Sequence, residues 1–157
     1  MKENQCEEIM SVERVPRFLQ PYEWAKKEWS ASIRELPGKD QNNPRILWYH
    51  SLTTLRATDD ETPWCSAFMC AAAFSAAFKS TRSAAAKSWL GYGVEGNGSI
   101  GDIVIFSRAG GHHVAFVHKA YKPGDKNICV LGGNQGNSVS VANYKAENLL
   151  AFRRFES

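Results

Sequence analysis

The chain has 157 residues, of which 43% are hydrophobic and 22% charged, a composition typical of a folded protein. This length suits one domain with a hydrophobic core and is short for two. The net charge of +3 is small and the lysines and arginines are scattered, which argues against nucleic acid as a partner.

The N-terminal residues 1–10 are polar and acidic, unlike a secretory signal, so we expect synthesis in the cytoplasm without a signal peptide. No apolar run reaches the roughly 18 residues that a membrane helix needs, so we expect no membrane insertion. The four cysteines are too few for a disulfide scaffold, and we expect them to be reduced: Cys6, Cys65, Cys70 and Cys129.

Two helices are predicted in the first third of the chain. Residues 1–20 show no clear period, and we expect a flexible or partly ordered segment before a single domain over residues 21–157. The first helix begins near Pro21, and its apolar residues share one face: Tyr22, Ala25, Trp29 and Ile33. Asn43 and Pro44 begin the second, with a capping side chain before a proline at the first helical position.

A third helix is predicted to begin at the cysteine segment. Thr62 would cap it, Pro63 would occupy its first position, and the apolar run would extend it to about Lys79. Cys65 would then lie in the first turn, where free backbone N–H groups and the helix dipole favour a nucleophilic thiolate. The acidic residues 59–61 just before it would complement the dipole but would also raise the pKa of the thiol.

The second half of the chain changes from helical to strand patterns. After a short helix over residues 84–90, strands are predicted at residues 102–107, 114–118, 128–131, 138–142 and 150–155, with tight turns between them. Helices followed by short strands predict an α+β domain, in which the N-terminal helices pack on a C-terminal antiparallel sheet of about five strands.

A cysteine nucleophile needs a histidine and a group that orients it. His112 and His113 lie together at the start of a predicted strand, but alternation directs them to opposite faces, and periodicity alone does not choose between them. Asn134 and Gln135 follow the next strand, where an amide oxygen could accept a proton from the imidazole ring.

Four segments occur along the chain in this order: Asp60-Glu61-Thr62-Pro63-Trp64-Cys65-Ser66-Ala67-Phe68, Gly101-Asp102-Ile103-Val104-Ile105-Phe106, Gly111-His112-His113-Val114-Ala115-Phe116-Val117 and Leu131-Gly132-Gly133-Asn134-Gln135. Together they resemble the CHAP amidases, a group of papain-like cysteine peptidases related to the NlpC-type cell-wall peptidases. More narrowly, the chain is similar to a subgroup found in phage lysis proteins and bacterial cell-wall-degrading toxins.

The resemblance implies a papain-like fold and a role for each matched residue. Cys65 is the nucleophile, His113 the general base and acid, and Asn134 the group that orients the histidine. His112 stays the alternative base. Gly132 stands where many of these enzymes have a glutamate, so the partner of the histidine is Asn134 or Gln135.

Three further residues are expected at the substrate: Trp64, Gln135 and Arg108. A zinc site built from Cys65, His112, His113 and Cys129 lacks the paired ligand spacing that such sites show, so we expect no metal and no other cofactor.

The implied activity is hydrolysis of an amide bond in peptidoglycan, at the N-acetylmuramoyl-L-alanine linkage or within the stem peptide. We expect a monomeric antibacterial toxin, such as a type VI secretion effector, that acts in the periplasm or cell wall after injection. A cognate immunity protein would then be its partner. The alternatives are a phage endolysin with the same chemistry and a non-catalytic cell-wall binding module.

Overall fold

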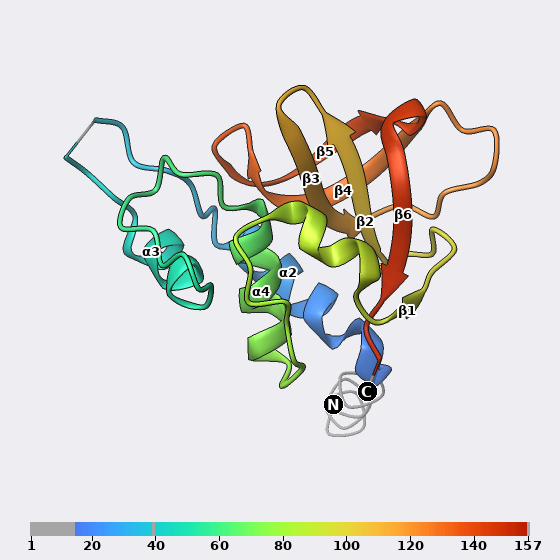
Figure 1. The fold of residues 1–157 in the computed structure, drawn as a ribbon, viewed down its shortest axis with the longest axis horizontal. Helices are drawn as coiled ribbons and strands as arrows, with labels where there is room; N and C mark the ends of the chain where they lie inside the picture. Colours follow the sequence, from blue (N-terminus) through green and yellow to red (C-terminus); the bar gives the residue numbers. More distant parts are fainter. Residues whose placement is uncertain (1–14, 39, 157) are drawn as a thin grey trace, which may run out of the picture.

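The computed structural model describes residues 15–38 and 40–156 (Figure 1). In chain order the elements are η1 (Arg17–Leu19), α2 (Gln20–Ser30), α3 (Pro44–Ser51), α4 (Cys65–Ser75), η2 (Ala86–Gly91), β1 (Val94–Glu95), β2 (Ile103–Arg108), β3 (Gly111–Val117), β4 (Asn127–Gln135), β5 (Ser138–Lys145), η3 (Ala146–Asn148) and β6 (Leu149–Arg154). The predicted α+β class is confirmed, with the helices before the sheet.

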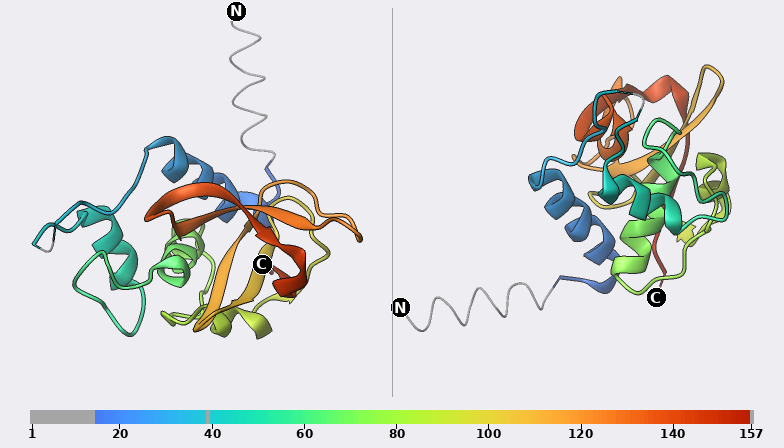
Figure 2. Two further views of the ribbon diagram at one scale, coloured as in Figure 1. Left: turned by 90° about the horizontal axis from the view of Figure 1, so that it is seen from above. Right: turned by 90° about the vertical axis from the view of Figure 1, so that its left-hand side faces the viewer.

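The strands form one open antiparallel sheet in the order β1-β6-β2-β3-β4-β5. It has six strands rather than the predicted five, because the two-residue β1 pairs with the end of β6 and is too short to leave a periodic signal. The sheet curls, so that Tyr144 of β5 stacks on Phe106 of β2 at 5.0 Å between ring centroids. Figure 2 shows this curl from above, where the orange-to-red strands lie across the others.

Each face of the sheet has its own core. One face packs against α4, with α2 and α3 behind it (Figure 1). The curl encloses a smaller core on the other face, made of Val104, Phe106, Ala115, Val117, Ile128 and Val130. The helices therefore cover one face of the sheet, while the curled strands themselves enclose the core on the other face.

Helix α4 is the central helix of the fold. Every residue from Cys65 to Ala73 is buried, which fits its run of small apolar side chains between the other helices and the sheet. It begins at Cys65 and not at Pro63, because the Asp59 carboxylate accepts from the backbone N–H of Thr62 at 2.7 Å and from its hydroxyl at 2.9 Å. It ends at Ser75 rather than near Lys79, since Ala77 adopts a φ of 59°.

The two earlier helices follow their sequence signals. Asn43 Oδ1 accepts from the Arg45 N–H at 2.8 Å and Pro44 is the first residue of α3, as predicted. The segment predicted at residues 84–90 forms the 3₁₀ helix η2 instead of an α-helix.

The N-terminal prediction is only partly covered by the described residues. Residues 1–14 lie outside them, but Arg17 already belongs to the fold, with its guanidinium 3.9 Å from the ring centroid of Phe78. No helix in residues 15–38 and 40–156 is long and apolar enough to cross a membrane. Cys65, Cys70 and Cys129 are free thiols, as expected.

Candidate active site

Cys65 is the first residue of α4 and is almost completely buried, with 4% of its surface exposed. Burial is the main influence on its thiol and raises its pKa. Backbone N–H groups act in the opposite direction, from Val114 on β3 and from Ser66 and Cys65 at the helix start, as does the positive charge of Arg108. The site therefore has groups that stabilise a thiolate, while the resting thiol stays protonated until a base removes its proton.

The pairing between strands β3 and β4 does not extend along β3 to Val114, the residue that influences Cys65. Their paired residues are Phe116 with Leu131 and Val117 with Val130, toward the far end of β3. Outside that pairing, the backbone N–H of Val114 lowers the pKa of the Cys65 thiol. Val114, the residue that follows His113 on β3, is thus the strand residue that influences the nucleophile.

His113 is fully buried on the face of the sheet that carries Ala115 and Val117, as alternation predicts. Its Nε2 lies 2.8 Å from Gln135 Oε1, and its Nδ1 is buried without a hydrogen-bond partner. An amide oxygen only accepts, so Nε2 carries the proton and the lone pair of the neutral ring is on Nδ1. The contact leaves a buried imidazole nitrogen ready to take a proton.

The charge state of His113 follows from its surroundings. Burial lowers the pKa of His113 to about 4; the hydrogen bond that the ring donates to Gln135 opposes this, and the Arg108 charge adds to the lowering. The ring also stacks on Tyr144, with 4.7 Å between centroids and 19° between planes. His113 is therefore neutral at pH 7 and fixed in position on both sides.

Gln135 is itself held in one orientation. Its Nε2 donates to the carbonyl of Ser140 at 2.7 Å, which directs its Oε1 to His113. A β-carbon at Gly132 would lie 2.7 Å from that Oε1 and 2.9 Å from Ala115 Cβ. The missing side chain at position 132 thus leaves the space that the Gln135 carboxamide fills.

The prediction that Asn134 orients the histidine does not match this arrangement, since the hydrogen bond is made by Gln135. The cause is a β-bulge between Gly132 and Gln135, where the β4–β5 register shifts from Gly132 opposite Ser140 to Gln135 opposite Ser138. Asn134 takes a φ of 59° in this bulge, and the extra residue brings Gln135 to the face of His113. Of the two amides that the sequence left open, the structure brings Gln135 to the ring.

The other residues expected at the site divide into buried and exposed ones. Trp64 is wholly buried, 5.9 Å from Tyr49 between ring centroids, and so presents no surface to a substrate in this structure. Arg108 is exposed at the end of β2, and its charge influences Cys65, His113 and Tyr144 alike. His112 is half-buried and lines an open pocket that also contains Arg108.

Asp59 and Asp60, two of the three acidic residues before Cys65, bind groups other than the thiol. Asp60 is fully buried and accepts from the backbone N–H groups of Leu36 and Asn43, both at 2.9 Å. Asp59 binds the turn before α4. Burial is the main cause that raises the pKa of Glu35, and the negative charges of these acids raise it further. The acids therefore act on Glu35. The sequence-level conflict between these acids and a thiolate is resolved by this placement.

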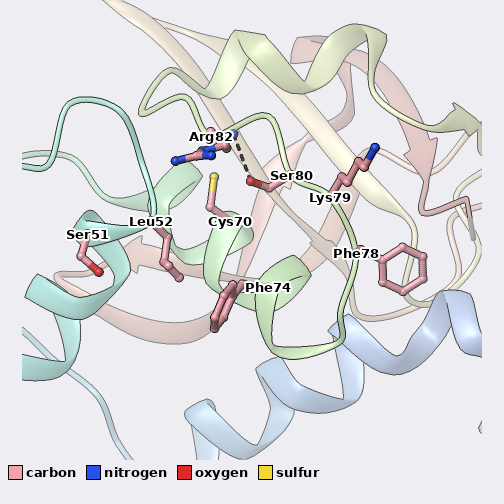
Figure 3. A pocket seen from close by; sticks show the side chains of 8 residues that line it. All are labelled: Ser51, Leu52, Cys70, Phe74, Phe78, Lys79, Ser80 and Arg82. Carbon is pink, nitrogen blue, oxygen red and sulfur yellow. Dashed lines mark hydrogen bonds between the residues drawn. The ribbon is translucent and has the colours of Figure 1, made fainter.

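A second cysteine lies at a different pocket. Figure 3 shows Cys70 behind a cavity of about 510 Å³ at the far end of α4, between Phe74, Arg82 and Leu52. Its sulfur is 3.9 Å from the carbonyl of Ser83, and burial raises the pKa of its thiol. No histidine lines this cavity, so Cys70 has no base comparable to His113 there.

Two residues that sequence reasoning missed complete the site. Tyr144 supports the His113 ring, but it lies on a strand predicted to end at residue 142, so no signal pointed to it. The role of Gly132 had a signal, namely a glycine where the resemblance predicts a glutamate. In the part of the chain that the structure describes, no three His, Cys, Asp or Glu residues are grouped to hold a metal. Comparison with protein-family models, curated proteins and solved structures finds no match for this chain.

Proposed function

We propose that this protein is a papain-like cysteine amidase in which Cys65 attacks, His113 transfers protons and Gln135 orients the histidine. The observation that carries the proposal is the contact of His113 Nε2 with Gln135 Oε1, which leaves Nδ1 free one residue from the Val114 amide at Cys65. A buried base with a defined tautomer, whose neighbour on β3 influences a thiol at a helix start, supports thiol acyl transfer.

The chemistry proceeds in two halves. Nδ1 of His113 takes the Cys65 proton as the sulfur attacks the amide carbonyl, and backbone N–H groups at the start of α4 stabilise the oxyanion. The imidazolium then protonates the leaving amine, which leaves a thioester on Cys65. His113 next removes a proton from water, the hydroxide attacks the thioester, and the acid product and the free thiol are released.

The proposed substrate is peptidoglycan, cut at the N-acetylmuramoyl-L-alanine amide or within the stem peptide. This part rests on the ordered segments around Cys65, His113 and Gln135 that resemble the CHAP and NlpC-type enzymes. The biological setting proposed is an antibacterial toxin, made in the cytoplasm and delivered to the periplasm of a target cell, with an immunity protein that blocks the site.

The test is incubation of purified peptidoglycan with the wild-type protein and with Cys65→Ala, His113→Ala and His112→Ala, followed by mass spectrometry of the released fragments. We expect fragments from the wild type and from His112→Ala only, and their masses identify the bond. Intact sacculi with the wild type would contradict the enzyme proposal. If the wild type binds sacculi and releases nothing, the protein is a wall-binding module.

A further inference from the structure

A pocket of about 430 Å³ opens beside the candidate active site and has no role in the chemistry above. Its walls come from two segments that adjoin the reacting residues and from η2. Pro63 lies two residues before Cys65, and the turn Arg108–His112 ends next to His113; Ala85, Ala86 and Lys87 form the remaining wall. A group bound here would be within the reach of a short peptide from the sulfur of Cys65.

The charged residues of this pocket are all of one sign. Lys87 and Arg108 are exposed, and no aspartate or glutamate lines the pocket. In the described residues neither cation has an ion-pair partner or a side-chain hydrogen bond, whereas Arg17, Arg45 and Arg154 each bind an oxygen atom. Two unpaired cations around a concave surface are a site for an anion.

We infer that this pocket is a subsite for a carboxylate carried by the substrate, with Lys87 and Arg108 as its ligands. The inference rests on the proposed function, because it takes the occupant to be part of the molecule that Cys65 attacks. Arg108 can donate two parallel hydrogen bonds to a carboxylate, and Lys87 supplies a second positive charge. Pro63 and the alanines Ala85, Ala86 and Ala109 give the pocket an apolar surface for the carbon chain of the ligand.

The pocket volume fits a group of this kind. About 430 Å³ lies at the lower end of the range for small-molecule sites, which leaves room for an amino-acid residue that carries a carboxylate. At Gly110 and Gly111 an added β-carbon would meet no atom within 4 Å, so the turn leaves the mouth of the pocket open. We therefore expect the subsite to bind a free carboxylate on the residue next to the scissile bond.

Binding is measured with the full chain carrying Cys65→Ala, so that no turnover occurs. The probes are a purified soluble muropeptide with free carboxylates and the same muropeptide after its carboxylates have been converted to amides. We expect the carboxylate form to bind at least about tenfold more tightly, and Lys87→Gln and Arg108→Gln each to weaken its binding about three- to tenfold. The amide form should be unaffected by either substitution.

Lys126→Gln is the matched control, because Lys126 is also exposed and lies at a different pocket. It should bind both probes as the parent does, and circular dichroism should show that all variants are folded. Equal affinity for the two probes, or binding insensitive to both substitutions, overturns the subsite. That result leaves the proposed function intact if the wild type still releases fragments from peptidoglycan, so the two failures are separate.

Discussion

At the scale of single residues, the site depends on how one histidine is held. Gln135 is fixed by Ser140, and it in turn fixes the proton of His113 on Nε2. The ring lies against Tyr144, and burial keeps it neutral. The chemistry that this histidine can perform is therefore set by side chains from β4 and β5, and not only by its own strand.

Replacing Gln135 tests whether it, and not Asn134, orients the histidine. We expect Gln135→Ala to lower kcat about 100-fold, because the histidine loses its fixed tautomer. It also leaves the buried His113 Nε2–H and Ser140 carbonyl unpaired, at about 1–3 kcal/mol each. The control is Asn134→Gly, which keeps the positive φ of that position and should remain active. Loss of activity in the control alone would return the orienting role to Asn134.

Gln135→Glu tests the contact between Gln135 and His113 through the pH dependence of the rate. A carboxylate at Oε1 stabilises the imidazolium, so the pKa of His113 should rise. Since the neutral ring is the base, the acid limb of the rate profile should move to higher pH. An unchanged acid limb would mean that His113 is not the titrating base.

The buried histidine also predicts how stability changes with pH. His113 has a pKa of about 4 in the folded protein against an ordinary value of 6.5, so the unfolded chain binds the additional proton between these values. Stability should fall as pH decreases through this window, by on the order of 3 kcal/mol from this residue. Denaturant unfolding at pH 7 and pH 4 should therefore show a larger loss for the wild type than for His113→Gln. Equal losses would contradict the lowered pKa.

At the scale of elements, α4 determines where the nucleophile lies. Phe68 is completely buried against Trp24 and Tyr49, at 5.5 Å and 5.4 Å between ring centroids, and its Cβ would lie 2.7 Å from a β-carbon on Gly133. One turn of the packed helix thus connects the aromatic cluster to the strand that carries Gln135.

Two phenylalanines on α4 give a matched test of this packing. Phe68→Ala should reduce the free energy of unfolding by about 3–5 kcal/mol, since it empties a fully buried site. Phe74 is 61% exposed, so Phe74→Ala should change it by less than about 1 kcal/mol. Denaturant titration of both variants measures the difference; similar losses would show that α4 does not pack on the sheet in this way.

Local signals predicted elements well where no distant group competed. Asn43 and Pro44 began α3 as expected, and the alternation at His113 and Ala115 gave the correct face. Thr62 failed as a cap because the carboxylate of Asp59 takes its hydroxyl, a choice that its own sequence context did not reveal. The sequence left Asn134 and Gln135 open as partners of the histidine, because the bulge that brings Gln135 to His113 has no periodic signature.

At the scale of the whole molecule, the α+β order of the chain was predictable from its change of periodicity, but the curl of the sheet was not. The stacking of Tyr144 on Phe106 and His113 joins β5 to strands that are not its neighbours in the sheet. Such a contact depends on the accumulated twist of several strands, and no local pattern records it.

The proposed setting makes a prediction about the intact protein in cells. Production in the cytoplasm of a Gram-negative host should be tolerated, whereas the same chain with an added export signal should lyse the cells. Exported Cys65→Ala, at matched abundance by immunoblot, should be harmless. Lysis by the exported variant would mean that toxicity does not depend on the thiol.

The empty position at Gly132 restricts how this site could evolve. In the enzyme family proposed for this chain a glutamate often stands there, and here the Gln135 carboxamide occupies that volume. The two arrangements exclude each other sterically, so a lineage that passes from one to the other meets an intermediate with both side chains or with neither. We expect Gly132→Glu and Gln135→Gly each to impair activity, and the double variant to recover part of it. With such non-additive effects, a change at position 132 would be retained only together with a change at position 135, so the two positions would covary among descendants.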